Sequence, residues 1–282
     1  MSGADAAAAP AERNADTARE AKARPIGVFD SGVGGLTVVA AVQRLLPRES
    51  ILYLGDTARL PYGTKSPSTV LAYSRKNVDF LVGRGVKAVV VACNTASAVA
   101  VGELQPPVPL WGVLGPGAAR AAAVSRGRVG IIATESTIDS DAYGRELRRL
   151  RPDVEVVSQP CPLFVPLVEE GWHNDPVAAE VARRYLAPLR ERGVDTLVLG
   201  CTHYPLLRRV IADVMGPEVM LVDSADAVAE VVAADLLRHE LARDDDGAAE
   251  HHFCVTDAGT RFAKIGARFL GTELLSLEWV DV

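Results

Sequence analysis

Two cysteines in similar settings are the first candidates for chemistry in this sequence. Each ends an apolar run and is followed by small hydroxyl or amide residues, in Val91-Ala92-Cys93-Asn94-Thr95 and in Leu199-Gly200-Cys201-Thr202-His203. We expect a strand to deliver each thiol to the start of a helix, where free backbone N–H groups and the helix dipole favour the thiolate. A thiolate is a base and a thiol is an acid, so two of them on opposite sides of a substrate can invert a stereocentre.

The residues that follow the two thiols could bind a substrate. An amide and hydroxyl groups there suit a carboxylate, and an imidazole could hydrogen-bond a thiol or polarise the substrate. These candidates are Asn94, Thr95, Thr202 and His203.

Two polar loops follow the first two apolar runs. The glycines of Asp30-Ser31-Gly32-Val33-Gly34-Gly35 let a ligand approach the backbone in front of a helix, although the segment can equally be a tight turn capped by Asp30. Its spacing is not the GxGxxG of a dinucleotide fold, and the chain has no GK[ST] of a P-loop. The loop from Gly55 to Gly63 is longer than a strand-to-helix connection needs. That length is typical of a functional loop, but a plain surface loop remains an alternative.

Other functions remain open on these residues alone. A zinc site of Cys93, Cys201 and His203 would need a second close ligand pair, which the sequence does not offer. A thiol hydrolase would pair Cys201 with His203, but residues two apart rarely form such a dyad, and Cys93 would be idle. An amino-acid-binding protein would not require two activated thiols. The remaining cysteines, Cys161 and Cys254, are expected to be structural. We expect no metal and no cofactor, since no nucleotide motif or pyridoxal lysine stands out.

Short apolar runs alternate with helix-length segments and must position these groups. The runs are continuous, which is typical of strands buried on both faces of a parallel α/β sheet, with ligands at the strands' carboxyl ends. The expected strands are Pro25–Asp30, Ile51–Gly55, Ala88–Ala92, Leu110–Val113, Arg128–Ala133, Val154–Ser158, Thr196–Gly200, Val219–Val222 and His252–Val255. The expected helices include Gly35–Leu46, Ser68–Gly83, Asp139–Leu150, Pro176–Arg192, Leu206–Val214 and Ala225–Leu241.

The chain also repeats itself. The segment Ile26–Ser31 resembles Val129–Thr134, and the two cysteines follow these segments at similar distances. We therefore expect two pseudo-symmetric α/β domains with parallel sheets and the active site in the cleft between them. The predicted division is a disordered leader (1–24), a first domain (25–115 plus 225–282) and a second domain (116–224), with the boundary near Gly115-Pro116-Gly117.

Composition narrows the class of protein. The chain of 282 residues has a net charge of −6, which argues against a nucleic-acid or anionic-membrane surface. No apolar run approaches the 18 to 20 residues of a membrane span, and the N-terminus has no apolar signal segment. With reduced thiols as the default, we expect a cytoplasmic protein.

Five segments carry a resemblance to a known family. They are PIGVFDSGVGGLTV (25–38), GDTARLPYG (55–63), VVACNTAS (90–97), CPLFVPLVEEG (161–171) and LVLGCTHYPLL (197–207). They resemble the glutamate racemases, cofactor-independent members of the aspartate/glutamate racemase superfamily, over about residues 25 to 270. The resemblance implies interconversion of L- and D-glutamate, which supplies D-glutamate for peptidoglycan. It also implies two pseudo-symmetric domains. The alternative is a racemase of the same superfamily that acts on aspartate or another acidic amino acid.

The resemblance also implies roles for single residues. Cys93 matches the catalytic thiol that works on D-glutamate, and Cys201 matches the thiol that works on L-glutamate. Asp30 and His203 match groups that assist the thiols, and Glu169 matches an auxiliary acid near the second. The residues that match substrate-contacting positions are Asp30, Ser31, Tyr62, Gly63, Asn94, Thr95, Thr202 and His203. Dimers are common in the family, so a homodimer is a further expectation.

Overall fold

Two parallel β-sheets form the framework of the protein. The computed structural model describes residues 19–257, 259–274 and 276–282. The first sheet has the order β10-β9-β2-β1-β3-β4, and the second has the order β6-β5-β7-β8. The strands of the first sheet are β1 (Ile26–Asp30), β2 (Ile51–Gly55), β3 (Ala88–Val91), β4 (Leu110–Gly112), β9 (His251–Val255) and β10 (Glu278–Trp279). Those of the second are β5 (Arg128–Ala133), β6 (Glu155–Pro160), β7 (Thr196–Gly200) and β8 (Met220–Asp223).

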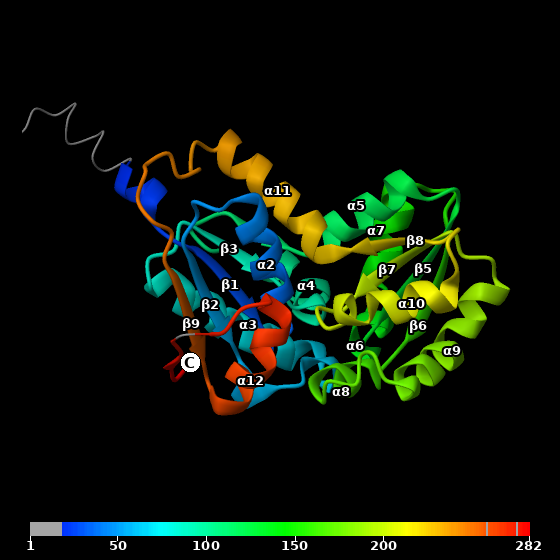
Figure 1. Cartoon of the computed structure of the whole chain (residues 1–282). Helices are drawn as coiled ribbons and strands as arrows, with labels where there is room; N and C mark the ends of the chain where they lie inside the picture. Colours follow the sequence, from blue (N-terminus) through cyan, green and yellow to red (C-terminus); the bar gives the residue numbers. More distant parts are fainter. Residues whose placement is uncertain (1–18, 258, 275) are drawn as a thin grey trace, which may run out of the picture.

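Helices surround each sheet and give the molecule two lobes (Figure 1). We call the part around the first sheet the first unit and the part around the second sheet the second unit. The first unit contains α2 (Leu36–Leu45), α3 (Pro67–Gly83), α4 (Asn94–Val99) and α12 (Gly259–Leu270), with the 3₁₀ turns η1 (Thr57–Arg59), η2 (Tyr62–Thr64) and η3 (Val101–Glu103). The second contains α5 (Leu114–Val124), α6 (Glu135–Asp139), α7 (Ala142–Leu150), α8 (Phe164–Glu169), α9 (Pro176–Glu191), α10 (Arg208–Met215) and η4 (Tyr204–Leu207). Helix α11 (Ser224–Arg238) packs against both α2 and α5 and so joins the two units.

The central strands are buried because their side chains are apolar on both faces. Every residue of β1, β2, β3 and β7 is buried, and these strands pair in parallel with their neighbours. Within the described residues, no helix is long and apolar enough to cross a membrane.

The two sheets have the same core topology. In the first, β1 lies between β2 and β3, with β4 beyond β3; in the second, β5 lies between β6 and β7, with β8 beyond β7. The expected fold class, a pair of pseudo-symmetric α/β units with parallel sheets, is confirmed. The chain returns to the first sheet after α11, because β9 pairs with β2. The exact domain boundaries stay a prediction, although β4 ends at Gly112 and α11 begins at Ser224.

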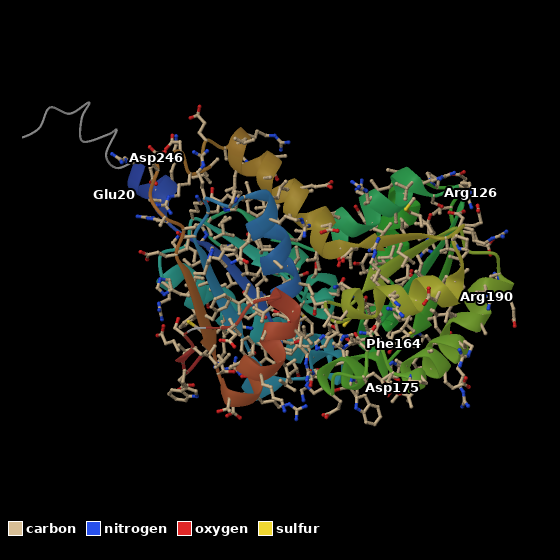
Figure 2. All side chains as sticks on the ribbon, in the orientation of Figure 1. Glu20, Arg126, Phe164, Asp175, Arg190 and Asp246 are labelled. Carbon is tan, nitrogen blue, oxygen red and sulfur yellow. The ribbon has the colours of Figure 1, made fainter. Side chains whose placement is uncertain are left out.

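The end of the predicted leader is ordered in the structure. Residues 1–18 of that leader lie outside the described part of the chain, whereas residues 19–23 are helical. The Lys22 ammonium pairs with Asp244 at 2.6 Å, and the Lys22 carbonyl accepts a hydrogen bond from the buried Lys87 ammonium. Figure 2 labels Glu20 and Asp246 at the same end of the molecule. These contacts tie residues 19–23 to the first unit. The disorder expected for the leader as a whole stays a prediction.

Candidate active site

A cavity of about 200 Å³ lies between the two units, at the carboxyl ends of the central strands. Both Cys93 and Cys201 line it, from opposite units. The first unit contributes Ser31, Gly32, Leu60, Pro61, Tyr62, Gly63, Thr64, Cys93, Asn94 and Thr95. The second contributes Thr134, Glu135, Pro162, Val165, Pro166, Glu169, Gly200, Cys201, Thr202 and His203. Among the described residues, no lysine or arginine lines the cavity, so hydroxyls, amides and one imidazole are the side chains that could receive a carboxylate.

Cys93 stands at the start of α4, as expected. It is the N-cap residue, and its Sγ accepts a hydrogen bond from the Ala96 amide at 3.5 Å. The thiol can donate to Ser31 Oγ at 3.7 Å. Ser31 follows β1 and Cys93 follows β3, so neighbouring strands bring these two groups together.

Burial decides the protonation of Cys93. Burial first, and then the charge of Asp30, raise the pKa of the Cys93 thiol to about 12, although the hydrogen bonds with Ala96 and Ser31 act in the opposite direction. The helix start thus acts in the expected direction, through the Ala96 amide, but burial outweighs it. The free energy lost by taking the sulfur out of water outweighs one amide hydrogen bond and the dipole of a short helix.

Asp30 lies behind the cavity wall rather than on it. It is almost fully buried, and Oδ2 accepts a hydrogen bond from the Gly32 amide at 3.0 Å. Oδ1 lies 3.5 Å from Thr202 Oγ1, which donates to it from the second unit. Burial raises the pKa of Asp30, against the charge of His203 and these hydrogen bonds. Asp30 is thus placed to act on Cys93 and Thr202 through charge and hydrogen bonding.

Cys201 has different surroundings, because no α-helix begins directly after it. A turn and the 3₁₀ helix η4 follow, and α10 starts only at Arg208. Pro205 explains this correction: it has no N–H to donate to the Cys201 carbonyl, as a helix starting at Thr202 would require. The tight turn brings His203 Nδ1 to 4.0 Å from Cys201 Sγ. This contact agrees with the expectation that the His203 imidazole could hydrogen-bond a thiol.

His203 connects Cys201 to a carboxylate. Its Nε2 lies 3.2 Å from Glu169 Oε1, and both side chains are largely buried. Burial alone would lower the pKa of His203, but hydrogen bonds to Cys201 and Glu169, together with their charges, raise it to about 10. Hydrogen bonding to His203, and then the charges of His203 and Arg261, lower the pKa of Glu169. The imidazole can thus pass a proton to or from the thiol, with Glu169 fixing its orientation.

The loop after β1 touches the loop after β7 at Gly34. A Cβ atom at this position would come within 2.3 Å of Thr202 Oγ1 and 2.5 Å of His203 Nδ1. Thr37 Oγ1 adds a hydrogen bond to the Thr202 carbonyl at 3.2 Å. The absence of a side chain at Gly34 is therefore what lets the two units approach each other beside Cys201.

A cluster of threonine hydroxyl groups also joins the two units. Thr95 Oγ1 lies 3.0 Å from Thr134 Oγ1 and 3.1 Å from Thr137 Oγ1, across the boundary between the units. Thr134 was not predicted as a site residue, although the internal repeat aligns it with Ser31. Thr134 follows β5 as Ser31 follows β1, and both line the cavity.

Two predicted substrate-contacting side chains already have protein partners. Asn94 accepts a hydrogen bond from Tyr143 at 2.7 Å and donates to Ser224 at 3.5 Å. The Tyr62 hydroxyl donates to the buried Asp56 carboxylate, so its hydroxyl points away from the cavity that its residue lines. Gly63, next to Tyr62, lines the cavity as well. Whether these residues contact substrate stays a prediction.

The arrangement suits proton transfer at a carbon atom. Two thiols face one cavity, one of them held as an acid by burial and the other linked to an imidazole. Sites of this kind exclude water and hold donors where charge develops in the transition state.

Comparison with known proteins agrees with this chemistry. Residues 26–232 match the Asp/Glu/hydantoin racemase family. Over 254 residues the chain is 56% identical to the glutamate racemase of Geobacter metallireducens, covering 89% of this chain and 94% of that protein. The crystal structure of glutamate racemase from Francisella tularensis in complex with D-glutamate is 38% identical, with a TM-score of 0.87, and covers 92% of this chain and 98% of that one. A glutamate racemase isoform from Bacillus anthracis is also 38% identical, with a TM-score of 0.88 and coverages of 93% and 98%. The resemblance expected from the motifs is confirmed. The chain belongs to the Asp/Glu/hydantoin racemase family, and it is an amino-acid racemase.

Proposed function

We propose that this racemase interconverts L- and D-glutamate by a two-base mechanism in which Cys93 and Cys201 exchange the α-proton. The observation that carries the proposal is the placement of the two thiols, which line one cavity from opposite units. The Francisella tularensis relative, which binds D-glutamate in its crystal structure, supports glutamate as the substrate. The mechanism requires no cofactor, because the thiols themselves supply the base and the acid.

The reaction of L-glutamate starts with Cys201 as the thiolate. It removes the α-proton from one face of the substrate, and negative charge develops on the α-carbon and its carboxylate. The Cys93 thiol, kept protonated by burial, then donates its proton to the other face. The carbon is now inverted, Cys201 is a thiol and Cys93 is a thiolate. The D enantiomer reacts by the same steps in the opposite order.

The other site residues bind the substrate and support the thiols. His203, oriented by Glu169, assists Cys201, and Asp30 acts on the Cys93 side. Ser31, Asn94, Thr95 and Thr202 surround the cavity with amide and hydroxyl groups that can hold the two carboxylates without a basic side chain. Such preorganised donors stabilise the charge that develops as the α-proton leaves, which is the costly part of this reaction.

The biological role follows from the product. We infer that the enzyme works in the cytoplasm and supplies D-glutamate for peptidoglycan, in the manner that the family resemblance implies. A homodimer is part of the same proposal.

Proton NMR of the purified protein in D₂O tests the proposed reaction. With L-glutamate, and separately with D-glutamate, the α-proton signal should disappear while the circular dichroism of the sample decays to zero. Aspartate serves as the comparison substrate and should react far more slowly. No exchange with either glutamate enantiomer, or faster exchange with aspartate, would overturn glutamate as the substrate. Exchange that preserves optical activity would overturn the two-base mechanism.

A further inference from the structure

The C-terminal helix α12 brings side chains of the first unit to the Glu169–His203 pair of the second. The buried residues of α12 include Phe262 and Ile265, and the helix packs against α2. Figure 1 shows α12 (orange-red) beside α8 (green), the short helix of the second unit that ends at Glu169. Side chains from α12 make hydrogen bonds to α8, so the two helices are in direct contact.

Arg261 holds the carboxylate that orients His203. Its Nη2 lies 3.4 Å from Glu169 Oε2 and 3.4 Å from Glu170 Oε1. The other oxygen of Glu169, Oε1, faces His203 Nε2 at 3.2 Å. Because its two oxygens have partners on different sides, the Glu169 carboxylate is restrained against rotation. Its orientation fixes which way the imidazole points.

Arg268 and Phe269 act on the same pair from two turns further along α12. Arg268 Nη1 donates a hydrogen bond at 3.0 Å to the carbonyl of Glu169, one of the free carbonyls at the end of α8. The Phe269 ring packs edge-on against the His203 ring, with 5.3 Å between centroids. Helix α12 thus contacts the carboxylate and the backbone of Glu169 and the imidazole of His203, the two residues that lead to Cys201.

We propose that Arg261 and Arg268 are positioning residues for the reaction: by holding Glu169, they direct His203 toward Cys201 and set the rate of proton transfer on that side. The inference rests on the proposed two-thiol mechanism. Neither arginine lines the cavity, so each acts through Glu169 and not on substrate. Since both arginines come from the first unit and Glu169 from the second, the Cys201 side is fully assembled only when the two units are in contact.

The double variant R261M/R268M tests this role. We expect a fall in kcat/KM of about 3- to 10-fold, because partly exposed ion pairs are weak. The fall in kcat/KM must be the same for L-glutamate and for D-glutamate. The ratio of the two kcat/KM values equals the equilibrium constant, which does not change because the enantiomers are equally stable. The size of the fall alone therefore cannot say which thiol is affected.

Deuterium isotope effects on kcat/KM identify the affected side. With α-deuterated L-glutamate, Cys201 breaks the labelled bond, so slowing the Cys201 step makes the isotope effect rise. With α-deuterated D-glutamate, Cys93 breaks the labelled bond and Cys201 then delivers a proton from solvent. Slowing the Cys201 step in that direction makes the isotope effect fall from its kinetic value toward the equilibrium isotope effect of the first transfer. The predicted signature is therefore a change of opposite sign for the two enantiomers, which a general loss of stability would not produce.

Lys264 provides the matched control. It is exposed on the same helix and has no ion pair with any described residue, so K264M should leave the rate and both isotope effects unchanged. The conservative variant R261K/R268K should recover part of the rate. Unchanged isotope effects in R261M/R268M, or effects that move in the same direction for both enantiomers, would overturn the positioning role. Absence of turnover in the wild-type enzyme would instead overturn the proposed function.

Discussion

The two sides of the cavity share a plan but differ in chemistry. On each side the thiol follows the strand that pairs with the first strand of its sheet, β3 beside β1 and β7 beside β5. Cys93 lies beside the Ala96 amide, the Ser31 hydroxyl and the charge of Asp30. Cys201 lies beside the His203 imidazole, which in turn pairs with the Glu169 carboxylate. The repeat thus accounts for the positions of the thiols. It does not account for their neighbours, since Asp30 on β1 corresponds to Ala133 on β5.

Because of this difference, the protonation state of the Cys93 thiol is defined in the free enzyme. Burial and the charge of Asp30 raise the pKa of the Cys93 thiol, so the first unit presents an acid. His203 keeps its proton up to about pH 10, so a cation stands beside Cys201. In the proposed mechanism, an acid at Cys93 is what the reaction of L-glutamate requires. The two sides, although built from one repeat, therefore place different electrostatic surroundings around their thiols.

The largest expected effect comes from removing either thiol. We expect C93S and C201S each to lower kcat/KM by about 10³-fold or more in both directions, since serine is a far weaker acid and both groups act in every turnover. The decay of circular dichroism from each enantiomer measures this loss. The matched control is C254S, a buried cysteine of the first sheet that does not line the cavity, and its activity should stay within a few-fold of the wild type. Substantial racemisation by C93S would contradict the two-thiol mechanism.

Replacing His203 should have a smaller effect, which arises from the proton transfer at Cys201 and lowers kcat/KM equally for both enantiomers. We expect H203N to lower kcat/KM by about 10²-fold, the lower range for a general acid–base group. The wild-type pKa of about 10 means that the imidazolium is present below that pH and is lost above it. If the reaction needs the imidazolium, the pH profile of kcat/KM falls as pH rises through about 10, and H203N lacks this fall. The exposed variant H252N should keep the wild-type profile. An unchanged basic limb in H203N would assign that limb to another group.

Local patterns in the sequence predicted the strands and the two thiols, but not the contacts between distant segments. All nine expected strands are present within two residues, because continuous apolar runs identify buried parallel strands. Short helices such as α6 and α8 were not expected, since five or six residues carry too little periodicity. Arg261 and Arg268 were missed for a different reason. Their partner Glu169 is about a hundred residues away in the chain, and no local pattern marks that encounter.

The smallest expected effect concerns the charge beside Cys93. Since that charge contributes to the raised pKa of the thiol, D30N should lower this pKa and increase the thiolate fraction at a fixed pH. We expect iodoacetamide to label Cys93 about 3- to 10-fold faster at pH 9, as a pKa change of up to one unit would produce. Labelling is measured by mass spectrometry in a C201S background, so that Cys201 does not react. The matched variant D56N, which removes another buried carboxylate of the first unit, should not accelerate labelling, because Asp56 is not among the groups that raise this pKa. Equal or slower labelling in D30N would mean that burial alone keeps Cys93 protonated. The contrast between the two sides would then rest on His203 and Glu169, without a contribution from Asp30.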